Sequence, residues 1–179
     1  MGIEIERKFL LANDDWRAAV TSTRHIAQGY LVDVRALREG TARASVRVRI
    51  SGDEAWLNIK SVELGVSRAE YELPLPLGDA QSMIETLCNG VLEKNRHHVE
   101  IDGWLFEIDE FLDKNSGLMV AEIELPDEHA SFPRPAWLGR EVSSLARYYN
   151  VNLIERPFAD WSEDERNATD AQTQQGERP

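Results

Sequence analysis

The chain has 179 residues, of which 42% are hydrophobic and 29% charged, and its formal net charge is −12. This length predicts one globular domain with a real core. The acidic balance argues against a nucleic-acid partner, because surfaces that neutralise phosphates carry an excess of Lys and Arg. One cysteine, Cys88, excludes an internal disulfide framework. Without a leader pattern or an apolar run near the roughly 18 residues that span a bilayer, we expect a cytoplasmic protein with no membrane partner.

Stretches with period-two alternation recur along the chain, and each carries paired charges on one face. In segment 3–9, Glu4, Glu6 and Lys8 alternate with apolar residues. Segment 25–34, with Gln28 and Tyr30 on one parity, predicts the next strand. The same alternation predicts six more strands, at 46–50, 56–60, 68–73, 94–100, 106–109 and 121–125.

Three helices are predicted between these strands, at 14–23 after an Asn13 cap, at 79–88 and at 140–150. Many strands with short turns favour an antiparallel barrel or sandwich over a doubly wound sheet. From Arg156 onward the composition becomes polar. We therefore predict one domain over 1–155 and a C-terminal segment over 156–179, disordered from about residue 165.

The polar faces of these strands are almost purely ionisable and are sorted into acid and base pairs, such as Glu4 with Glu6 and Arg47 with Arg49. For any one strand, a solvated outer face remains a sufficient interpretation. Like charges on one strand face repel, however, so all of these pairs together indicate a neutralising partner. Carboxylates suit hard divalent cations, and Arg and Lys suit phosphate. A sheet closed into a barrel would bring both sets to one centre, with its apolar faces covered by helices.

The opening Glu4-Ile5-Glu6-Arg7-Lys8 resembles the ExExK motif of the CYTH superfamily, the triphosphate tunnel metalloenzymes, and the later charge pairs recur in that family's order. The likeness runs from Gly2 to about Asn150 and is closest to short bacterial inorganic triphosphatases. It implies a mostly β (α+β) fold, an eight-stranded antiparallel closed β-barrel with a few surface and plug helices. It also implies metal-dependent hydrolysis of inorganic triphosphate to pyrophosphate and phosphate, with Mg²⁺ or Mn²⁺ as cofactor. The partner is then a small-molecule triphosphate, and monomer and homodimer both stay open.

The resemblance also assigns roles by position. Metal would be held by Glu4, Glu6, Glu122 and Glu124. The triphosphate would be bound by Lys8, Arg47, Arg49, Lys60, Arg68, Lys94, Arg96 and Arg147. Catalytic candidates are Lys8, Tyr30, Glu6 and Asp109, and the other tunnel carboxylates are Glu70, Glu72 and Glu107. Which of Glu6, Glu72 and Asp109 orients the water is open, and Tyr30 could equally be a half-buried strand tyrosine. Arg147 is the candidate contact from a segment that resembles the one closing a tunnel end in relatives.

Other functions remain open. Adenylate cyclases of the superfamily tend to carry a Gly-Leu-Gly-x-Phe run, but segment 116–124 lacks the second glycine and the phenylalanine. A thiamine triphosphatase would be expected to stack an aromatic residue before the paired arginines, where Ala44 and Ser45 stand. A nucleoside triphosphatase and a non-catalytic polyphosphate-binding module are the remaining alternatives.

Overall fold

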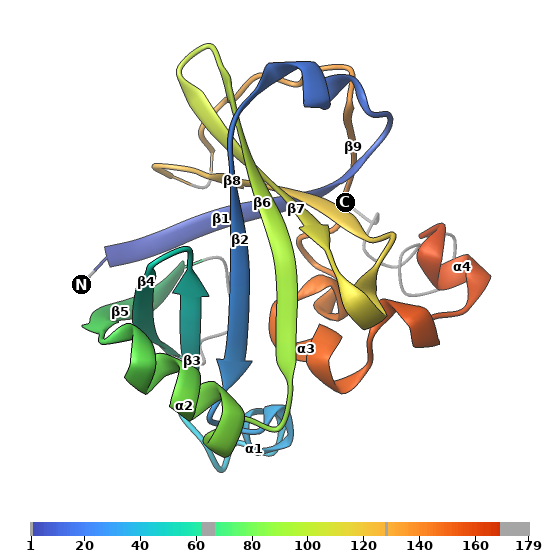
Figure 1. Cartoon of the computed structure of the whole chain (residues 1–179). Helices are drawn as coiled ribbons and strands as arrows, with labels where there is room; N and C mark the ends of the chain where they lie inside the picture. The colour runs from blue at the N-terminus through green and yellow to red at the C-terminus, as the bar shows by residue number, and fades with distance from the viewer. Residues whose placement is uncertain (1, 62–66, 128, 169–179) are drawn as a thin grey trace.

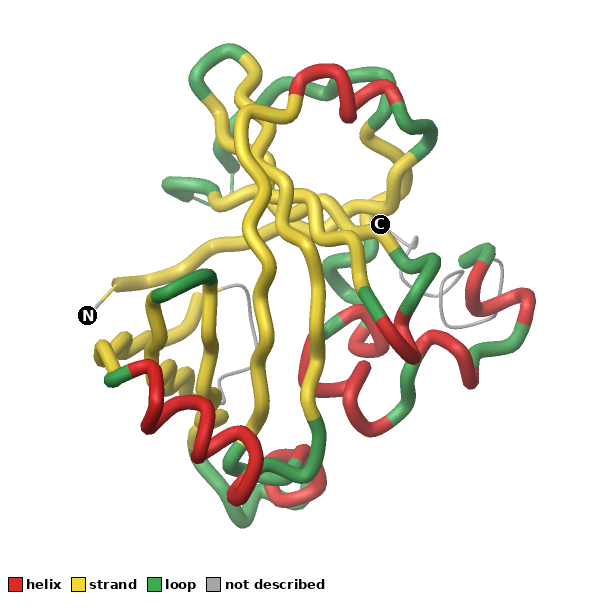
Figure 2. The backbone as a smooth tube through the Cα atoms, in the orientation of Figure 1, coloured by secondary structure: helices red, strands yellow, loops and turns green. Residues whose placement is uncertain are grey.

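A computed structural model describes residues 2–61, 67–127 and 129–168, and shows mainly antiparallel strands with short helices at the periphery (Figures 1 and 2). The strands are β1 (Gly2–Leu11), β2 (Val20–Tyr30), β3 (Ala44–Ser51), β4 (Glu54–Ser61), β5 (Ser67–Leu75), β6 (Val91–Ile101), β7 (Trp104–Phe111), β8 (Met119–Glu124) and β9 (Leu138–Glu141). The α-helices are α1 (Val34–Arg38), α2 (Leu77–Leu87), α3 (Asn150–Glu155) and α4 (Glu163–Arg166). The short 3₁₀-helices are η1 (Asp15–Ala19), η2 (Asp113–Asn115), η3 (Ala146–Tyr148) and η4 (Phe158–Asp160).

The strands follow one another in the order β5-β4-β3-β2-β6-β7-β8-β1-β9, and every pair is antiparallel. The first residues of β1 also pair with β5, from Gly2 opposite Glu70 to Ile5 opposite Ser67. This pairing brings the two ends of the eight-strand order together around a tunnel. The eight predicted strands and the mostly antiparallel fold are confirmed, and β9 is an additional strand beside β1.

The strand pleat separates a charged inner face from an apolar outer face, as the alternation predicts. On the β1–β8 pair, Lys8 lies opposite Glu122, whereas the next residues, Phe9 and Ala121, are fully buried in a cluster outside the tunnel. That cluster is covered by the loop after β8, including Trp137, and by Trp16 of η1. Helix α2 covers β3 and β4 in a second cluster, and the C-terminal segment forms a third over β6, β7 and β8. These clusters keep the charged faces turned inward.

Two predicted helices are corrected by long-range pairing. Only residues 15–19 of the predicted helix 14–23 are helical, because β2 already begins at Val20 and pairs with β6, with Thr23 opposite His97. β-Branched residues such as Val20 and Thr23 fit a strand with a partner better than a helix. The strand predicted over 25–34 therefore spans 20–30, and Asp33 caps α1, accepting a hydrogen bond from the Arg35 amide at 2.7 Å. Helix α2 matches its prediction.

The helix predicted over 140–150 is also wrong. Its first residues continue β9, which pairs with β1 from Phe9 opposite Glu141 to Leu11 opposite Leu138. The Val142 amide then donates to the Lys8 carbonyl at 2.8 Å, and the helical turns η3 and α3 begin only at Ala146 and Asn150. The free edge of β1 provides a hydrogen-bonding partner that local helix propensity does not reveal.

Residues 156–168 pack onto the same body as the tunnel. Trp161 belongs to the buried cluster over β6, β7 and β8, and the carbonyl of buried Ala168 accepts a hydrogen bond from Arg140. The structured chain thus continues past the predicted boundary near residue 165, and the remaining tail prediction, over 169–179, lies outside the described residues. Within the described part of the chain, none of the helices combines the length and apolar character needed to cross a membrane.

We predict that Gly29→Ala destabilises the fold, because a Cβ atom there would stand 2.7 Å from Cys88 Sγ and 2.8 Å from Cys88 Cβ. The expected loss in the free energy of unfolding is about 1 to 3 kcal/mol, measured by urea denaturation. Gly78→Ala is the control, because its Cβ would meet no atom within 4 Å and the change should stabilise α2 by about 0.4 to 1 kcal/mol. Equal stability of the two variants would contradict the close approach of β2 to Cys88.

Candidate active site

A cavity of about 610 Å³ runs through the barrel, and the strands contribute most of its wall. Helices α1 and α3 add Leu37 and Val151, and the β6–β7 turn adds Gly103. Most of the predicted site residues line it: Glu6, Lys8, Tyr30, Arg47, Arg49, Lys60, Glu70, Glu72, Lys94, Arg96, Glu107, Glu122 and Glu124. The barrel therefore brings together side chains that lie more than 100 residues apart in the chain.

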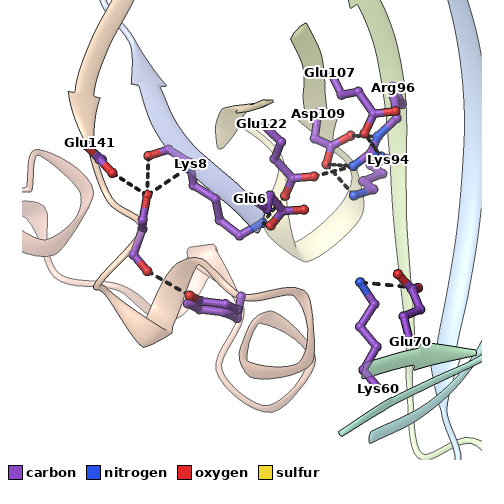
Figure 3. A network of polar contacts seen from close by, with 12 residues as sticks. Glu6, Lys8, Lys60, Glu70, Lys94, Arg96, Glu107, Asp109, Glu122 and Glu141 are labelled. Carbon is purple, nitrogen blue, oxygen red and sulfur yellow. Dashed lines mark hydrogen bonds and ion pairs between the residues drawn. The ribbon is translucent and has the colours of Figure 1, made fainter. Parts of the chain in front are cut away.

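The Lys8 ammonium lies between the carboxylates of Glu6 and Glu122 and forms an ion pair with each (Figure 3). Burial alone would lower the pKa of Lys8, but these carboxylates outweigh it and raise that pKa above its ordinary value. Conversely, burial would raise the pKa of Glu122, whereas Lys8, Arg96 and Lys94 hold it well below the usual range. At neutral pH Lys8 and Glu122 are thus both charged, although both side chains are almost completely buried.

Arg96 is the centre of a second group of ion pairs beside the first (Figure 3). Its guanidinium donates to Asp109 through Nε and Nη2, both at 2.7 Å, to Glu122 at 2.6 Å and to Glu107. Asp109 also accepts from the Lys94 ammonium. Burial, followed by the neighbouring Arg96, lowers the pKa of Lys94 to about 8 against the attraction of Asp109. This wall therefore contains matched acids and bases.

Arg47 and Arg49 are less fully matched. An Arg47 Nη1 donates to the Gln28 side-chain oxygen at 3.5 Å, and Arg49 lies 3.8 Å from a carboxylate oxygen of Glu72. The buried Nε atoms of both arginines have no hydrogen-bond partner among the described residues. Burial, then Arg47 and Arg96, lowers the pKa of Arg49 to about 10. This excess of positive charge with unused N–H donors is suited to an anion that enters the cavity.

The third part of the wall comes from β4 and β5. The Lys60 ammonium lies 3.5 Å from Glu70, and the Asn58 side chain donates to Glu72 at 2.9 Å and to Glu70 at 3.3 Å. Figure 3 shows Lys60 and Glu70 apart from the cluster around Arg96. Cations of this wall and of the Arg96 cluster can therefore approach one ligand from different sides.

Four predicted site residues are not placed on the cavity wall. Asp109 has no exposed surface and lies behind the wall, where it contacts Lys94 and Arg96. The Arg147 guanidinium packs 5.1 Å from the Tyr148 ring centroid and 5.4 Å from that of Trp161. For Glu4 and Arg68 the structure describes the backbone but not the side chain. The predicted direct contacts of Asp109 and Arg147 with the ligand thus find no support in this geometry.

Several polar residues on or near the cavity wall received no role from the sequence, and Gln28, Asn58 and Tyr149 are examples. Gln28 lines the cavity and is almost completely buried, with its amide 3.5 Å from the Tyr30 hydroxyl. Asn58 holds Glu70 and Glu72, and Tyr149 lines the cavity from the C-terminal segment. Strand parity could have identified Gln28 and Asn58, which alternate with apolar residues. No local signal could have identified Tyr149, because the pattern around it predicted a helix.

The carboxylates that face the cavity suit a hard divalent cation. Glu6 lies directly opposite Glu124 on the β1–β8 pair, and Glu107 lies opposite Glu122 on β7–β8, although like charges in such positions repel. The shared contact of Lys8 with Glu6 and Glu122 shows that these two carboxylates face a common cation position. Oxygen donors of this kind are the ligands that Mg²⁺ and Mn²⁺ prefer. Among the described residues, no three Asp, Glu, His or Cys side chains lie close enough together to hold a metal ion in this arrangement.

An antiparallel barrel whose cavity combines incompletely paired arginines with facing carboxylates defines a tunnel-type site for a compact polyanion. Comparison with known proteins agrees with this class. The family model described as the CYTH domain matches residues 2–158, and the chain belongs to this family.

Two curated relatives are similar over most of their length, and both are named inorganic triphosphatase. The protein from Acetivibrio thermocellus is 41% identical over 164 residues, covering 91% of this chain and 100% of the relative. The protein from Nitrosomonas europaea is 36% identical over 155 residues, covering 84% and 95%. A crystal structure of an inorganic triphosphatase superposes with a TM-score of 0.63 at 32% identity and covers 86% of this chain and 95% of that one. A putative adenylate cyclase from Bacillus halodurans, at 16% identity and a TM-score of 0.57, shares the fold alone.

The lowered pKa of Lys94 predicts that anion binding weakens in mildly alkaline solution. Below a pKa of about 8 the Lys94 ammonium is charged and attracts the anion, and above it this attraction is lost. Calorimetric titration of tripolyphosphate in EDTA should therefore give a dissociation constant that rises between pH 7 and pH 9. Lys94→Arg, which stays protonated over this range, is expected to flatten that rise. The same pH dependence in both proteins would assign it to another group or to the ligand.

Proposed function

We propose that this chain is an inorganic triphosphatase that hydrolyses tripolyphosphate to pyrophosphate and phosphate with the help of a divalent metal ion. The observation that carries the proposal is the division of the cavity into two kinds of wall. One wall holds the incompletely paired guanidinium groups of Arg47 and Arg49, and the other holds the carboxylates Glu6 and Glu122 around Lys8. The names of the relatives, which are similar along nearly their whole length, support the same activity.

This division suggests how the substrate lies in the tunnel. Arg47 and Arg49 would hold the phosphate groups that do not react, because their Nε atoms have no hydrogen-bond partner among the described residues. Lys60, which also lines the cavity, would add a positive charge from β4. The reacting phosphate would lie near Lys8, Lys94 and Arg96, next to the facing carboxylates. A guanidinium binds two phosphate oxygens at once, and an ammonium adds a compact charge.

Hydrolysis requires neutralisation of the charge on the reacting phosphate, an oriented water and a stabilised leaving group. Lys8 and Arg96 would supply the positive charge, while Arg47 and Arg49 would stabilise the departing pyrophosphate. Glu6 lines the cavity and is the better placed carboxylate to orient water, since Asp109 lies behind the wall. Asp109 would instead fix Lys94 and Arg96. The Tyr30 hydroxyl, near the Gln28 amide, would hydrogen-bond the substrate.

Glu4, Glu6, Glu122 and Glu124 are the residues that we propose to hold Mg²⁺ or Mn²⁺. Such an ion, when bound, polarises phosphate oxygens and lowers the pKa of a coordinated water. With Glu6 and Glu122 engaged by such an ion, the Lys8 ammonium would be available to pair with the substrate. The cytoplasmic location, the lack of a nucleic-acid partner, and a monomeric or homodimeric state stay predictions.

The alternative functions are a thiamine triphosphatase, a binding module without catalysis and an adenylate cyclase. Ser45 lines the cavity next to the paired arginines, where an aromatic residue would be needed to stack on thiamine. A binding module without catalysis would have no use for the carboxylate wall. Adenylate cyclase activity finds no support beyond the shared fold.

We predict rapid release of phosphate from tripolyphosphate with Mg²⁺ or Mn²⁺, slow release from ATP and thiamine triphosphate, and none with EDTA. The tunnel offers cations for three phosphates and, by this proposal, no dedicated place for a base or thiazole ring. A colorimetric phosphate assay with each substrate and metal checks this. Preferential turnover of an organic triphosphate would refute the inorganic substrate.

Glu122→Gln should lower kcat for tripolyphosphate by about 100-fold or more, because it removes a buried charge that balances Lys8 and Arg96 and a proposed metal ligand. Binding of tripolyphosphate in EDTA should persist, since the arginine wall is unchanged. Glu85→Gln on the exposed surface of α2 is the matched control and should retain wild-type kinetics. Unchanged activity of Glu122→Gln would exclude our metal assignment, and a wild type that binds tripolyphosphate without hydrolysing it would favour a binding module.

A further inference from the structure

Tyr149 contributes an aromatic ring from the C-terminal segment to the cavity wall, and the mechanism above gives it no task. It stands between η3 and α3, far in sequence from the N-terminal strand. The Lys8 Nζ atom nevertheless lies 5.5 Å from the centroid of its ring. This distance is within the range in which the face of an aromatic ring attracts a cation.

The ring is held in place by hydrogen bonds that lead back to the same lysine. The Tyr149 hydroxyl donates to the Ser143 carbonyl at 2.8 Å. The Ser143 hydroxyl oxygen accepts from the backbone N–H of Lys8 at 2.9 Å, and the hydroxyl donates to Glu141 at 2.8 Å. The Val142 amide donates to the Lys8 carbonyl at 2.8 Å. One segment, 141–149, thus binds both backbone polar groups of Lys8 and contacts its ammonium.

The segment is fixed from outside by the neighbour of Lys8 on β1. Arg7 points away from the tunnel and donates two hydrogen bonds to Glu141, one of them at 2.8 Å from Nε (Figure 3 shows Glu141 on this side of Lys8). Alternating side chains of one strand therefore serve two purposes. Arg7 anchors the C-terminal segment, and Lys8 receives the ring that this segment carries.

The Tyr149 ring is important because the two carboxylates that pair with Lys8 are also proposed to bind the metal ion. Glu6 and Glu122 now neutralise its ammonium, but they are also proposed metal ligands. A carboxylate whose charge is drawn to a divalent cation attracts an ammonium less strongly. The aromatic face carries no net charge and does not compete for the metal, so it can keep its contact with Lys8 in either state. A cation–π contact of this kind corresponds to roughly 3- to 30-fold in an equilibrium or a rate.

We propose that Tyr149 is a positioning residue that holds the Lys8 ammonium in the tunnel, directed at the reacting phosphate. This inference rests on the proposed function, because the phosphate to which Lys8 is directed belongs to the proposed substrate. A tyrosine with a merely space-filling task would instead affect stability and activity together.

The test compares Tyr149→Leu, Tyr149→Phe and Tyr71→Leu with the wild type. Tyr71 lies half-exposed on β5, away from the cavity lining, so its replacement controls for the loss of a tyrosine. Tyr149→Leu should lower kcat for tripolyphosphate by roughly 3- to 30-fold with little change in KM, since other cations hold the unreactive phosphates. Tyr149→Phe keeps the ring and should recover most of this loss, and Tyr71→Leu should match the wild type.

A second readout does not depend on turnover. In ¹H–¹³C NMR spectra with and without Mg²⁺, the ε-methylene signal of Lys8, assigned through Lys8→Arg, should show an upfield ring-current shift. That shift should persist in Tyr149→Phe and disappear in Tyr149→Leu. Equal kinetics of Tyr149→Leu and wild type, equal impairment of the Leu and Phe variants, or a Lys8 signal indifferent to the ring would overturn the proposal. A wild type inactive on tripolyphosphate would refute the proposed function, and the NMR comparison alone would then decide the contact.

Discussion

The structure depends on the burial of many ionised side chains in one enclosed cavity. A charge that leaves water is costly unless an opposite charge or a hydrogen bond replaces its hydration. Asp109, with no exposed surface, satisfies this condition by accepting from both Lys94 and Arg96. Arg96 in turn contacts three carboxylates on β7 and β8. The strand order that places β6 beside β7 and β7 beside β8 is what makes these contacts possible.

The protein does not neutralise all of the charges in the cavity, so the two parts of the wall differ. Around Lys8, acids and bases balance, whereas Arg47 and Arg49 keep buried Nε atoms with no partner in the described structure. Burial, and then repulsion by Arg47 and Arg96, lowers the pKa of Arg49. A bound anion would offset both effects, so part of the cost of burying this charge would be recovered as binding affinity. Donors fixed in this way before the substrate arrives need little reorganisation during the reaction.

The C-terminal segment completes the site in a way that its composition does not suggest. By pairing with the edge of β1 it covers backbone groups that would otherwise be exposed, and it fixes the residue whose side chain enters the tunnel. It continues into α3, which contacts α1 through the ion pairs of Arg35 and Arg38 with Glu155. Residues from the N-terminal strand and from the C-terminal segment therefore meet at the cavity wall.

The sequence by itself determined eight of the nine described strands and the direction of their faces. Alternation is a local property, so the pairs Glu4 and Glu6, Arg47 and Arg49, and Glu122 and Glu124 revealed a charged inner face before any partner strand was known. The ExExK opening, together with the later charge pairs in the same order, then indicated the family. Parity alone could not tell that Asp109 lies behind the wall, because depth depends on the neighbouring strands and on barrel twist.

Only the tertiary structure decided where the C-terminal residues lie. Residues 140–150 satisfy a helical pattern, but the open edge of β1 forms hydrogen bonds with the first of them, and a partner 130 or more residues away leaves no local trace. The same distance hid Tyr149, whereas Arg147, the expected contact, packs against Trp161. Local periodicity reports which face a side chain takes, and long-range pairing decides what that face meets.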